Sequence, residues 1–148
     1  MNEIVRLIKY DELNKLLYLY RQLQPNDPDV YENKELIDTW NLIYNDPSLY
    51  YIVVEVDGKI VSSCNISIIK NLTRNLRSYG LIENVITDSN YRKKGYATKA
   101  LNMAIDIAKN NNCYKVMLLT GSKKEETLNF YEQAGFIRGI KTGFVKNL

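Results

Sequence analysis

The sequence predicts a single α/β (α+β) domain in which a mixed, mostly antiparallel sheet is flanked by helices. Three observations support this fold class. The 148 residues, 45% of them hydrophobic, fit one domain with its own core. A two-residue turn signal joins two runs of β-forming residues, and segments with helical spacing alternate with short β-rich segments. The predicted element order is βααβββαβαββ over residues 1–148.

The first third of the chain predicts one strand and two helices. Residues 4–8 form a short β-branched run, and Asp11 is expected to cap a helix with apolar positions at Leu13, Leu16, Leu17 and Tyr20. Two prolines stop this helix and leave an acidic surface loop over residues 24–29. A second helix is predicted over residues 33–44 and must end before Asp46-Pro47.

The middle of the chain predicts a hairpin and one further strand. Residues 50–56 and 59–69 are the hairpin strands, and Asp57-Gly58 is the turn between them. A polar loop near residues 71–75 leads to a strand over residues 81–87. The helix that follows has its apolar positions at Ala97, Leu101, Ala104, Ile105 and Ala108.

The C-terminal third predicts a strand, a helix and a final hairpin. Residues 115–119 are the strand. Ser122 and Glu125 match a capping box that opens a helix reaching Ala134, and Gly135 is expected to end it. Residues 136–140 and 144–146 are predicted as a short hairpin, which gives the sheet its last two strands.

The composition excludes several kinds of chemistry. No histidine is present, so imidazole bases and histidine-ligated metals are excluded, and no metal is expected. A general base must be a carboxylate, an amine, a phenol, a thiolate or water. Cys64 and Cys113 lie in no C-x-x-C pair, and two reduced thiols are expected rather than one bridge. The net charge is only +3, which does not indicate any particular class of binding partner.

No targeting segment is expected from the first residues. These residues, Met-Asn-Glu-Ile-Val-Arg, lack the basic and then apolar arrangement of a signal peptide. No apolar run approaches the length of a membrane span. We therefore expect a cytoplasmic protein without a membrane partner.

Residues 81–97 have the features of an anion-binding site. A strand there leads into a helix N-terminus, whose unpaired backbone N–H groups and dipole attract negative charge. Gly95 permits close approach of a phosphate, Ala97 leaves the next turn uncrowded, and three positive charges surround them, on Arg92, Lys93 and Lys94. A diphosphate is the natural guest, although the P-loop and G-x-G-x-x-G patterns are absent.

Two motifs in this chain resemble the GNAT superfamily of N-acetyltransferases. Arg92-x-x-Gly95-x-Ala97 resembles the [QR]-x-x-G-x-[GA] motif that binds the pyrophosphate of acyl-CoA. Some thirty residues later, a second segment resembles the family's other signature, namely Asn129-Phe130-Tyr131-Glu132-Gln133-Ala134-Gly135-Phe136. In that signature a helix ends at Gly-Phe and the chain turns into a strand. The motifs stand in the family's order and separation, and the resemblance covers essentially the whole chain.

The resemblance implies a site for acetyl-CoA as co-substrate. Two central GNAT strands splay apart, so the backbone of Val85 and Thr87 would pair with the pantetheine arm like an added strand. Asn129 matches a position whose side chain often meets the pantetheine. Arg92 stands at the start of the pyrophosphate motif, and the amides that would cradle the pyrophosphate belong to Lys93, Lys94, Gly95, Tyr96, Ala97 and Thr98.

The resemblance also implies catalytic roles, and the chemistry of acetyl transfer is consistent with them. An ammonium ion must lose a proton before it attacks a thioester, and Glu83, the only acidic side chain of its strand, stands where several members place a base acting through water. Tyr131 matches the residue often proposed to protonate the departing thiolate. A backbone N–H near Val85 would stabilise the oxyanion. Direct attack in a ternary complex then needs no covalent enzyme intermediate.

The acceptor is expected between the first two helices and the splayed strands. That position places Asp27, Asp29, Tyr31 and Tyr50 near its entrance. Carboxylates attract cations, which favours an amine of a small molecule or peptide over an acidic substrate.

Several alternatives stay open at this point. The domain could be a non-catalytic acyl-CoA-binding or regulatory module of the same fold. Arg92, Lys93, Lys94 and Lys99 could instead contact nucleic acid, the less favoured hypothesis given the modest net charge. Glu83 could be an ordinary surface carboxylate, and Tyr131 could be a packing residue. A homodimer is an open alternative to a monomer.

Overall fold

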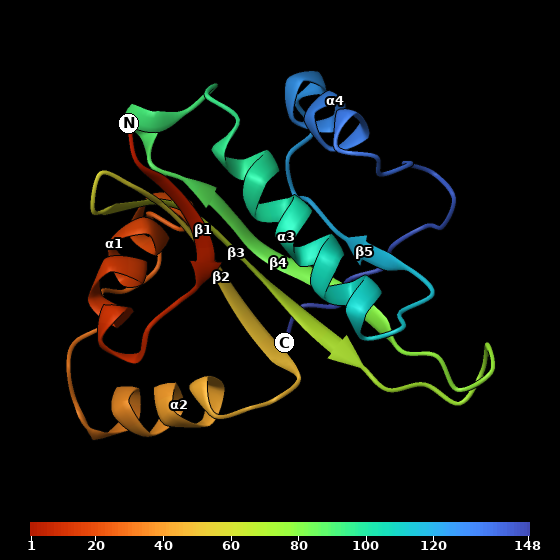
Figure 1. The fold of residues 1–148 in the computed structure, drawn as a ribbon, viewed down its shortest axis with the longest axis horizontal. Helices are drawn as coiled ribbons and strands as arrows, with labels where there is room; N and C mark the ends of the chain where they lie inside the picture. Colours follow the sequence, from red (N-terminus) through yellow and green to blue (C-terminus); the bar gives the residue numbers. More distant parts are fainter.

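The computed structural model describes all 148 residues and contains one five-stranded sheet in the order β1-β2-β3-β4-β5 (Figure 1). The first four strands pair antiparallel, and β5 pairs parallel with β4, which confirms the predicted fold class. The strands are β1 (Glu3–Leu7), β2 (Leu49–Val56), β3 (Lys59–Ile69), β4 (Tyr79–Thr87) and β5 (Val116–Leu118). The helices are α1 (Leu13–Leu23), α2 (Lys34–Tyr44), α3 (Tyr96–Asn110) and α4 (Glu125–Gln133), with 3-10 turns at Tyr10–Glu12 and Ser89–Tyr91.

The sheet separates two hydrophobic cores. Figure 1 shows α3 crossing one face of the sheet, where its apolar side is buried with Ile52, Ile66 and Ile82. The other core joins α1 and α2 to Val53 and its neighbours on the opposite face. Ile52 and Val53 are adjacent in β2 and enter different cores, because successive side chains of a strand point to opposite faces.

The β2–β3 hairpin forms as the turn residues predict. Asp57 and Gly58 both adopt left-handed backbone angles, with φ of 48° and 83°. Two consecutive left-handed residues form the type I′ turn that matches the twist of paired strands. The prediction for residues 57–58 is therefore confirmed.

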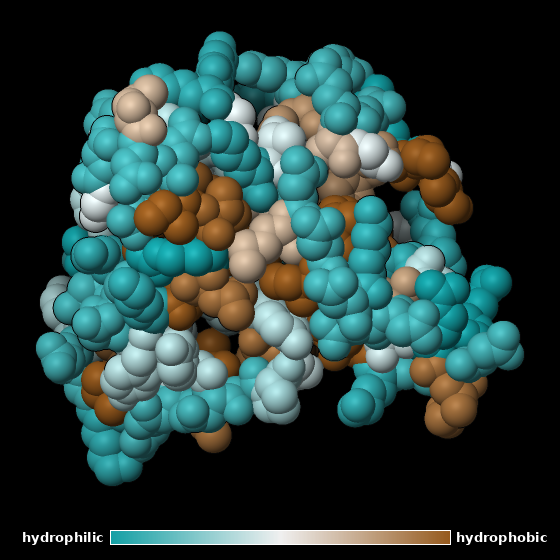
Figure 2. All heavy atoms as spheres, viewed as in Figure 1, coloured by the Kyte–Doolittle hydropathy of each residue, from teal (hydrophilic) through white to brown (hydrophobic).

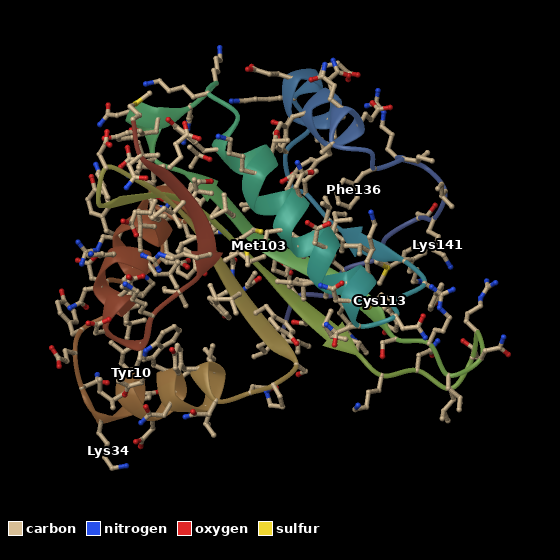
Figure 3. All side chains as sticks on the ribbon, in the orientation of Figure 1. Tyr10, Lys34, Met103, Cys113, Phe136 and Lys141 are labelled. Atoms are coloured by element: carbon tan, nitrogen blue, oxygen red, sulfur yellow. The ribbon has the colours of Figure 1, made fainter.

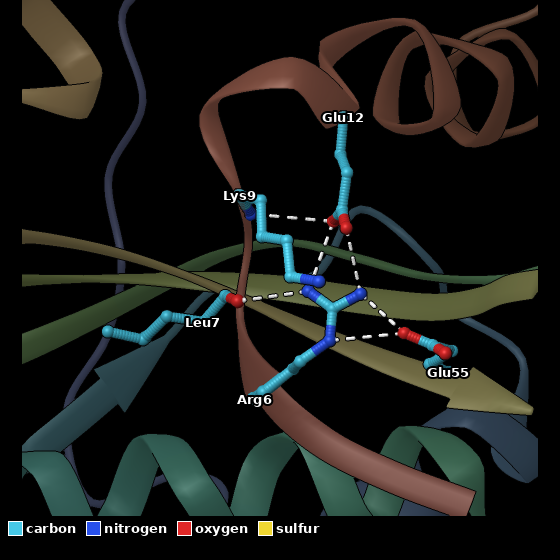
Figure 4. A network of polar contacts seen from close by, with 5 residues as sticks. All are labelled: Arg6, Leu7, Lys9, Glu12 and Glu55. Atoms are coloured by element: carbon cyan, nitrogen blue, oxygen red, sulfur yellow. Dashed lines mark hydrogen bonds and ion pairs between the residues drawn. The ribbon is translucent and has the colours of Figure 1, made fainter. Parts of the chain in front are cut away.

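Two predicted helix caps are wrong. Asp11 lies in a 3-10 turn, and Glu12 is the residue that precedes α1. Figure 4 shows why: the buried Glu12 carboxylate accepts hydrogen bonds from the Arg6 guanidinium and the Lys9 amide, while Arg6 also donates to Glu55. This network binds the start of α1 to β1 and β2.

The capping box of α4 is the second wrong cap. Lys124 precedes α4, and the Ser122 hydroxyl accepts a hydrogen bond from the Lys124 amide at 3.3 Å and contacts the Thr127 hydroxyl at 3.1 Å. Ser122 therefore shapes the loop before the helix rather than its first turn. The end of the helix is as predicted, since Gly135 takes the left-handed φ of 98°.

The predicted C-terminal hairpin is also wrong. Residues 136–148 contain no strand, so the element order ends at α4. Phe136 is half-buried and its ring meets Tyr131 edge-on at 6.3 Å, below α4 in Figure 3. Residues 137–148 are all exposed and gain no sheet neighbour, and a two-stranded hairpin without a packed face is barely stable in water.

The surface is mixed in character. In the view of Figure 2, hydrophilic residues cover most of the molecule and apolar residues emerge in smaller groups. Cys64 and Cys113 are both free, as expected. No helix combines the length and the apolar character needed to cross a membrane.

Candidate active site

A bulge interrupts β4 in the middle of the sheet. Ser63 pairs with Ile86 and Asn65 pairs with Glu83, so Cys64 alone faces two residues, Asn84 and Val85. Asn84 adopts a left-handed φ of 54°. An extra residue on one strand reverses the side-chain alternation beyond it.

The reversal is visible in the two cores. Ile82 and Ile86 are four residues apart and would share a face of a regular strand, yet Ile82 enters the α3 core and Ile86 the α1 core. Because of the bulge, the isoleucines of the two halves of β4 pack on opposite faces of the sheet.

Beyond the bulge, one edge of β4 is free. β5 pairs with β4 only from Gly80 to Ile82. The Ile86 carbonyl accepts a hydrogen bond from the Ser62 hydroxyl, and the Asp88 amide donates one to the Val61 carbonyl at 2.8 Å. The backbone groups of Ile86 and Asp88 therefore face β3. Because backbone groups alternate along a strand, those of Val85 and Thr87 face the other way, toward the edge that β5 does not reach.

The loop after β4 presents a run of free backbone amides. None of the N–H groups of residues 92–98 donates a hydrogen bond within the protein. Gly95 precedes α3 with a left-handed φ of 84°, and Lys93 is also left-handed at 62°. Arg92, Lys93 and Lys94 are exposed. Free amides at the start of a 15-residue helix, surrounded by cations, form a site for a phosphate-sized anion.

This loop, which we call the phosphate loop (residues 92–98), is anchored by the turn before it. The buried Asp88 carboxylate accepts from the Asn90 amide at 3.0 Å and lies 3.3 Å from the Lys59 ammonium. The Asn90 hydrogen bond outweighs burial and, with Lys59, holds the pKa of Asp88 below its usual value. The Ser89 amide donates to the Gln22 side chain at 2.9 Å. The turn is thereby fixed to both β3 and α1.

Tyr131 of α4 lies on the α3 side of the sheet. Its half-buried ring packs edge-on against Phe130 at 5.0 Å, and it belongs to the core that contains Cys64, the residue opposite the bulge. Burial, with a smaller effect from Cys64, raises the pKa of the Tyr131 phenol. The phenol is therefore protonated at neutral pH and can donate a proton.

Glu83 and Asn129 are more exposed than these residues. Glu83 directly precedes the bulge, and its carboxylate has no hydrogen bond or ion pair within the protein. Asn129 is exposed on α4 and makes no side-chain hydrogen bond. The loop and α4 are linked by the Lys93–Glu126 ion pair at 3.6 Å, which is highly exposed. The roles predicted for Glu83 and Asn129 stay predictions.

A cavity of about 710 Å³ lies on the opposite side, between α1 and α2. Asp27, Asp29 and Tyr31 line it, whereas Tyr50, also expected there, does not. We call this cavity the acceptor pocket. Its 16 lining residues are Leu17, Tyr20, Arg21, Leu23, Gln24, Pro25, Asp27, Pro28, Asp29, Val30, Tyr31, Asn33, Glu35, Leu36, Thr39 and Asn84.

Tyr20 and Asn84 are among the pocket residues that were not predicted. The Tyr20 hydroxyl is buried without a hydrogen-bond partner. Burial raises the pKa of Tyr20, with a smaller rise from Tyr51 and an opposing effect of Asn84. A polar residue inside the apolar run of residues 81–87 could have indicated the bulge at Asn84. No sequence feature could have placed Tyr20 in the pocket, because its position in the helical pattern predicts a core residue.

Comparisons with known proteins identify the family. The model of the acetyltransferase (GNAT) family matches residues 13–136. The chain belongs to the GNAT acetyltransferase family. A proposed acetyltransferase from Agrobacterium tumefaciens str. C58 has a TM-score of 0.92 and 37% identity, with 98% of this chain and 99% of that chain covered. The family prediction is therefore confirmed.

Two glucosamine-6-phosphate N-acetyltransferases are also similar to this GNAT chain. The crystal structure from Arabidopsis thaliana has a TM-score of 0.84 and 26% identity, covering 100% of this chain and 99% of that one. The enzyme from Trypanosoma brucei brucei is 37% identical over 79 residues, 53% of this chain. That alignment spans only 52% of the relative's length.

Proposed function

We propose that this GNAT chain, acting as one domain over residues 1–148, transfers the acetyl group of acetyl-CoA to a primary amine of a small molecule or peptide. One observation carries the proposal: the free edge of β4 and the free amides of the phosphate loop follow each other at the same end of the strand. GNAT acetyltransferases use acetyl-CoA, whose pantetheine arm and pyrophosphate have the chemistry that these two features can bind.

The backbone provides most of the binding groups for acetyl-CoA. Val85 and Thr87 would exchange main-chain hydrogen bonds with the amides of the pantetheine arm. The amides of residues 93–98 would bind the pyrophosphate, with charge support from Arg92, Lys93 and Lys94. Asn129, exposed on the neighbouring α4, would meet the arm from the side. No backbone hydrogen bond has to break for the pyrophosphate to bind, because none of the amides of residues 93–98 donates a hydrogen bond within the protein.

The transfer itself follows from the groups around the bulge. The acceptor ammonium gives one proton through water to Glu83, and the amine lone pair then attacks the thioester carbonyl. A backbone N–H near Val85 stabilises the oxyanion. The carbon–sulfur bond breaks, the attacking nitrogen loses its second proton to water, and Tyr131 gives its proton to the departing thiolate. The products are the acetylated amine and CoA with a free thiol, and one proton passes to solvent as Glu83 and Tyr131 return to their initial states.

Thermal unfolding tests the cofactor site first. Saturating acetyl-CoA and free CoA should raise the melting temperature, and ATP, as a control with phosphates but no pantetheine arm, should raise it less. Release of the CoA thiol with a panel of amines then tests transfer. Binding of acetyl-CoA without transfer to any amine would favour the non-catalytic module. A cytoplasmic location stays a prediction, and a homodimer stays an open alternative to a monomer.

A further inference from the structure

The acceptor pocket carries more negative than positive charge. Asp27, Asp29 and Glu35 contribute three carboxylates, and Arg21 contributes the single cation of the lining. None of the three carboxylates forms an ion pair or a side-chain hydrogen bond within the protein. Their negative charge is therefore not neutralised by a neighbouring cation of the chain.

Two neutral polar residues of the pocket lining, Tyr20 of α1 and Asn84 of β4, lie where the pocket meets the sheet. Asn84 is on the bulge, next to the free edge of β4, so this part of the pocket is nearest to the proposed thioester site. The Tyr20 hydroxyl is buried beside Asn84, which is near enough to lower its pKa, and it forms no hydrogen bond of ordinary length and angle within the protein. Buried polar groups are normally paired, and an unpaired hydroxyl facing a cavity is available to a bound molecule. The reacting amine can supply that partner.

We propose that the acceptor is a small aliphatic amine that carries a second cationic group. This inference rests on the proposed function and names the substrate class for the same site. The reacting amine lies against Tyr20 and Asn84, and the second cation lies among Asp27, Asp29 and Glu35. A pocket of about 710 Å³ is within the ~300–1,000 Å³ range of small-molecule sites.

The same charges disfavour a phosphorylated amine. The phosphate of a glucosamine 6-phosphate acceptor would meet three unpaired carboxylates and one guanidinium. Like charges in one site repel and cost affinity. The acceptor named for the A. thaliana and T. brucei brucei relatives is therefore not the acceptor that this pocket favours.

Three acceptors of equal length test the inference. 1,4-Diaminobutane, 4-amino-1-butanol and 4-aminobutyrate each present a reacting primary amine, and their far ends carry a positive, a neutral and a negative group; the two equivalent amines of the diamine account for a factor of two at most. With acetyl-CoA saturating, kcat/KM from thiol release should be highest for the diamine and lowest for the amino acid. An exposed ion pair changes affinity by a factor of about 1.5 to 5, and three carboxylates act on the second cation, so we expect about a tenfold difference between diamine and alcohol. Raising the salt concentration should reduce that ratio.

Charge-removing variants locate the effect. Asp27→Asn, Asp29→Asn and Glu35→Gln should each lower the ratio of kcat/KM for the diamine to that for the alcohol. These side chains are exposed, so the melting temperature should not change. Glu32→Gln is the matched control, because Glu32 lies in the same loop but does not line the pocket. It should leave the ratio unchanged.

The outcomes separate this inference from the proposed function. Equal rates for the three acceptors, a preference for 4-aminobutyrate or glucosamine 6-phosphate, or a ratio insensitive to all three carboxylate variants would overturn the charge inference. Failure to acetylate the diamine while acetyl-CoA still raises the melting temperature would overturn it too, and would leave the cofactor site in place. Failure of acetyl-CoA to bind would remove the proposed function itself.

Discussion

The two proposed binding regions meet at β4 but are built from different parts of the chain. The phosphate loop is one continuous segment whose proposed binding groups are free backbone amides. The acceptor pocket gathers side chains from α1, α2, the loop between them and Asn84 of β4. A site made of consecutive backbone groups needs a particular turn, and such turns restrict the local sequence. A pocket made of side chains depends on tertiary packing, and many sequences can supply it.

The largest expected effect concerns Tyr131, which packs against the core that contains Cys64, the residue opposite the bulge. A general acid contributes roughly 10²- to 10⁴-fold to a rate, so Tyr131→Phe should lower kcat about 100-fold. The KM for acetyl-CoA should stay within about twofold, because the ring and its packing are retained. Steady-state thiol-release kinetics measure both constants.

Tyr114→Phe is the control for Tyr131→Phe. Tyr114 packs on Tyr79 at 6.3 Å, at the other end of β4. Its loss of a hydroxyl should leave kcat unchanged. An unchanged kcat in Tyr131→Phe would show that the phenol is not the proton donor.

The next largest effect concerns the acceptor side alone. The Arg6–Glu12–Glu55 network holds the start of α1, the helix that carries Tyr20 and Arg21 into the pocket. Glu12 is almost fully buried, and hydrogen bonds to charged groups are worth about 1.5–3 kcal/mol. Glu12→Gln should therefore lower the free energy of unfolding by about 2 kcal/mol at pH 7 and raise the acceptor KM more than the acetyl-CoA KM.

The stability effect of Glu12 depends on pH. Burial alone would raise the pKa of Glu12, but hydrogen bonds from Arg6 and the Lys9 amide, with the charge of Arg6, outweigh it and lower the pKa. A carboxylate with a lowered folded pKa stabilises the protein above its unfolded pKa, and this contribution disappears as the pH falls through the folded value. Denaturant unfolding should show the difference between wild type and Glu12→Gln shrinking as the pH falls below the ordinary glutamate pKa of 4.5.

A difference that stayed constant down to acid pH would show that Glu12 acts by shape rather than charge. Glu32→Gln, at an exposed site, should show no difference from wild type at any pH.

A smaller effect is expected in the phosphate loop, where a matched pair of glycines separates strain from binding. Gly58 and Gly95 have φ of 83° and 84°, and neither has an atom within 4 Å of an added Cβ. Gly58→Ala and Gly95→Ala should each lower the free energy of unfolding by about 1 kcal/mol, because a residue with a Cβ is disfavoured at a left-handed backbone angle. Only Gly95→Ala should raise the KM for acetyl-CoA, by about tenfold, since the proposed site places its amide and its neighbours against the pyrophosphate. Equal KM values in the two variants would contradict the proposed phosphate loop.

The same contrast explains which features could be predicted from sequence. Asp57-Gly58, Gly95 and Gly135 each occupy a left-handed position, and local sequence alone selects them. Asp11 failed as a cap because the choice between Asp11 and Glu12 depends on Arg6 and Glu55, which come from two strands. The final hairpin failed because a strand needs an edge to pair with, and nothing in residues 136–148 indicates whether one is available.

The candidate site divides along the same line. The segment from Arg92 to Thr98 could be located from its own residues, and the structure shows its amides free. Tyr20 and Asn84 could not, because their proximity arises from the packing of α1 on β4 and from a bulge that only the pairing register reveals.

The smallest effect on activity is expected at Cys64, opposite the bulge. Burial raises the pKa of this thiol to about 12, so it is protonated and a poor nucleophile at neutral pH. Direct attack of the amine needs no covalent acetyl-enzyme, and Cys64→Ala should keep kcat within about twofold of wild type. Removal of the buried sulfur should cost about 1 kcal/mol of stability through the cavity it leaves. Initial rates at varied concentrations of both substrates should give intersecting reciprocal plots. Parallel plots, together with an inactive Cys64→Ala, would instead place an acetyl-thioester on the one buried cysteine beside Tyr131 and replace the ternary complex by a two-step transfer.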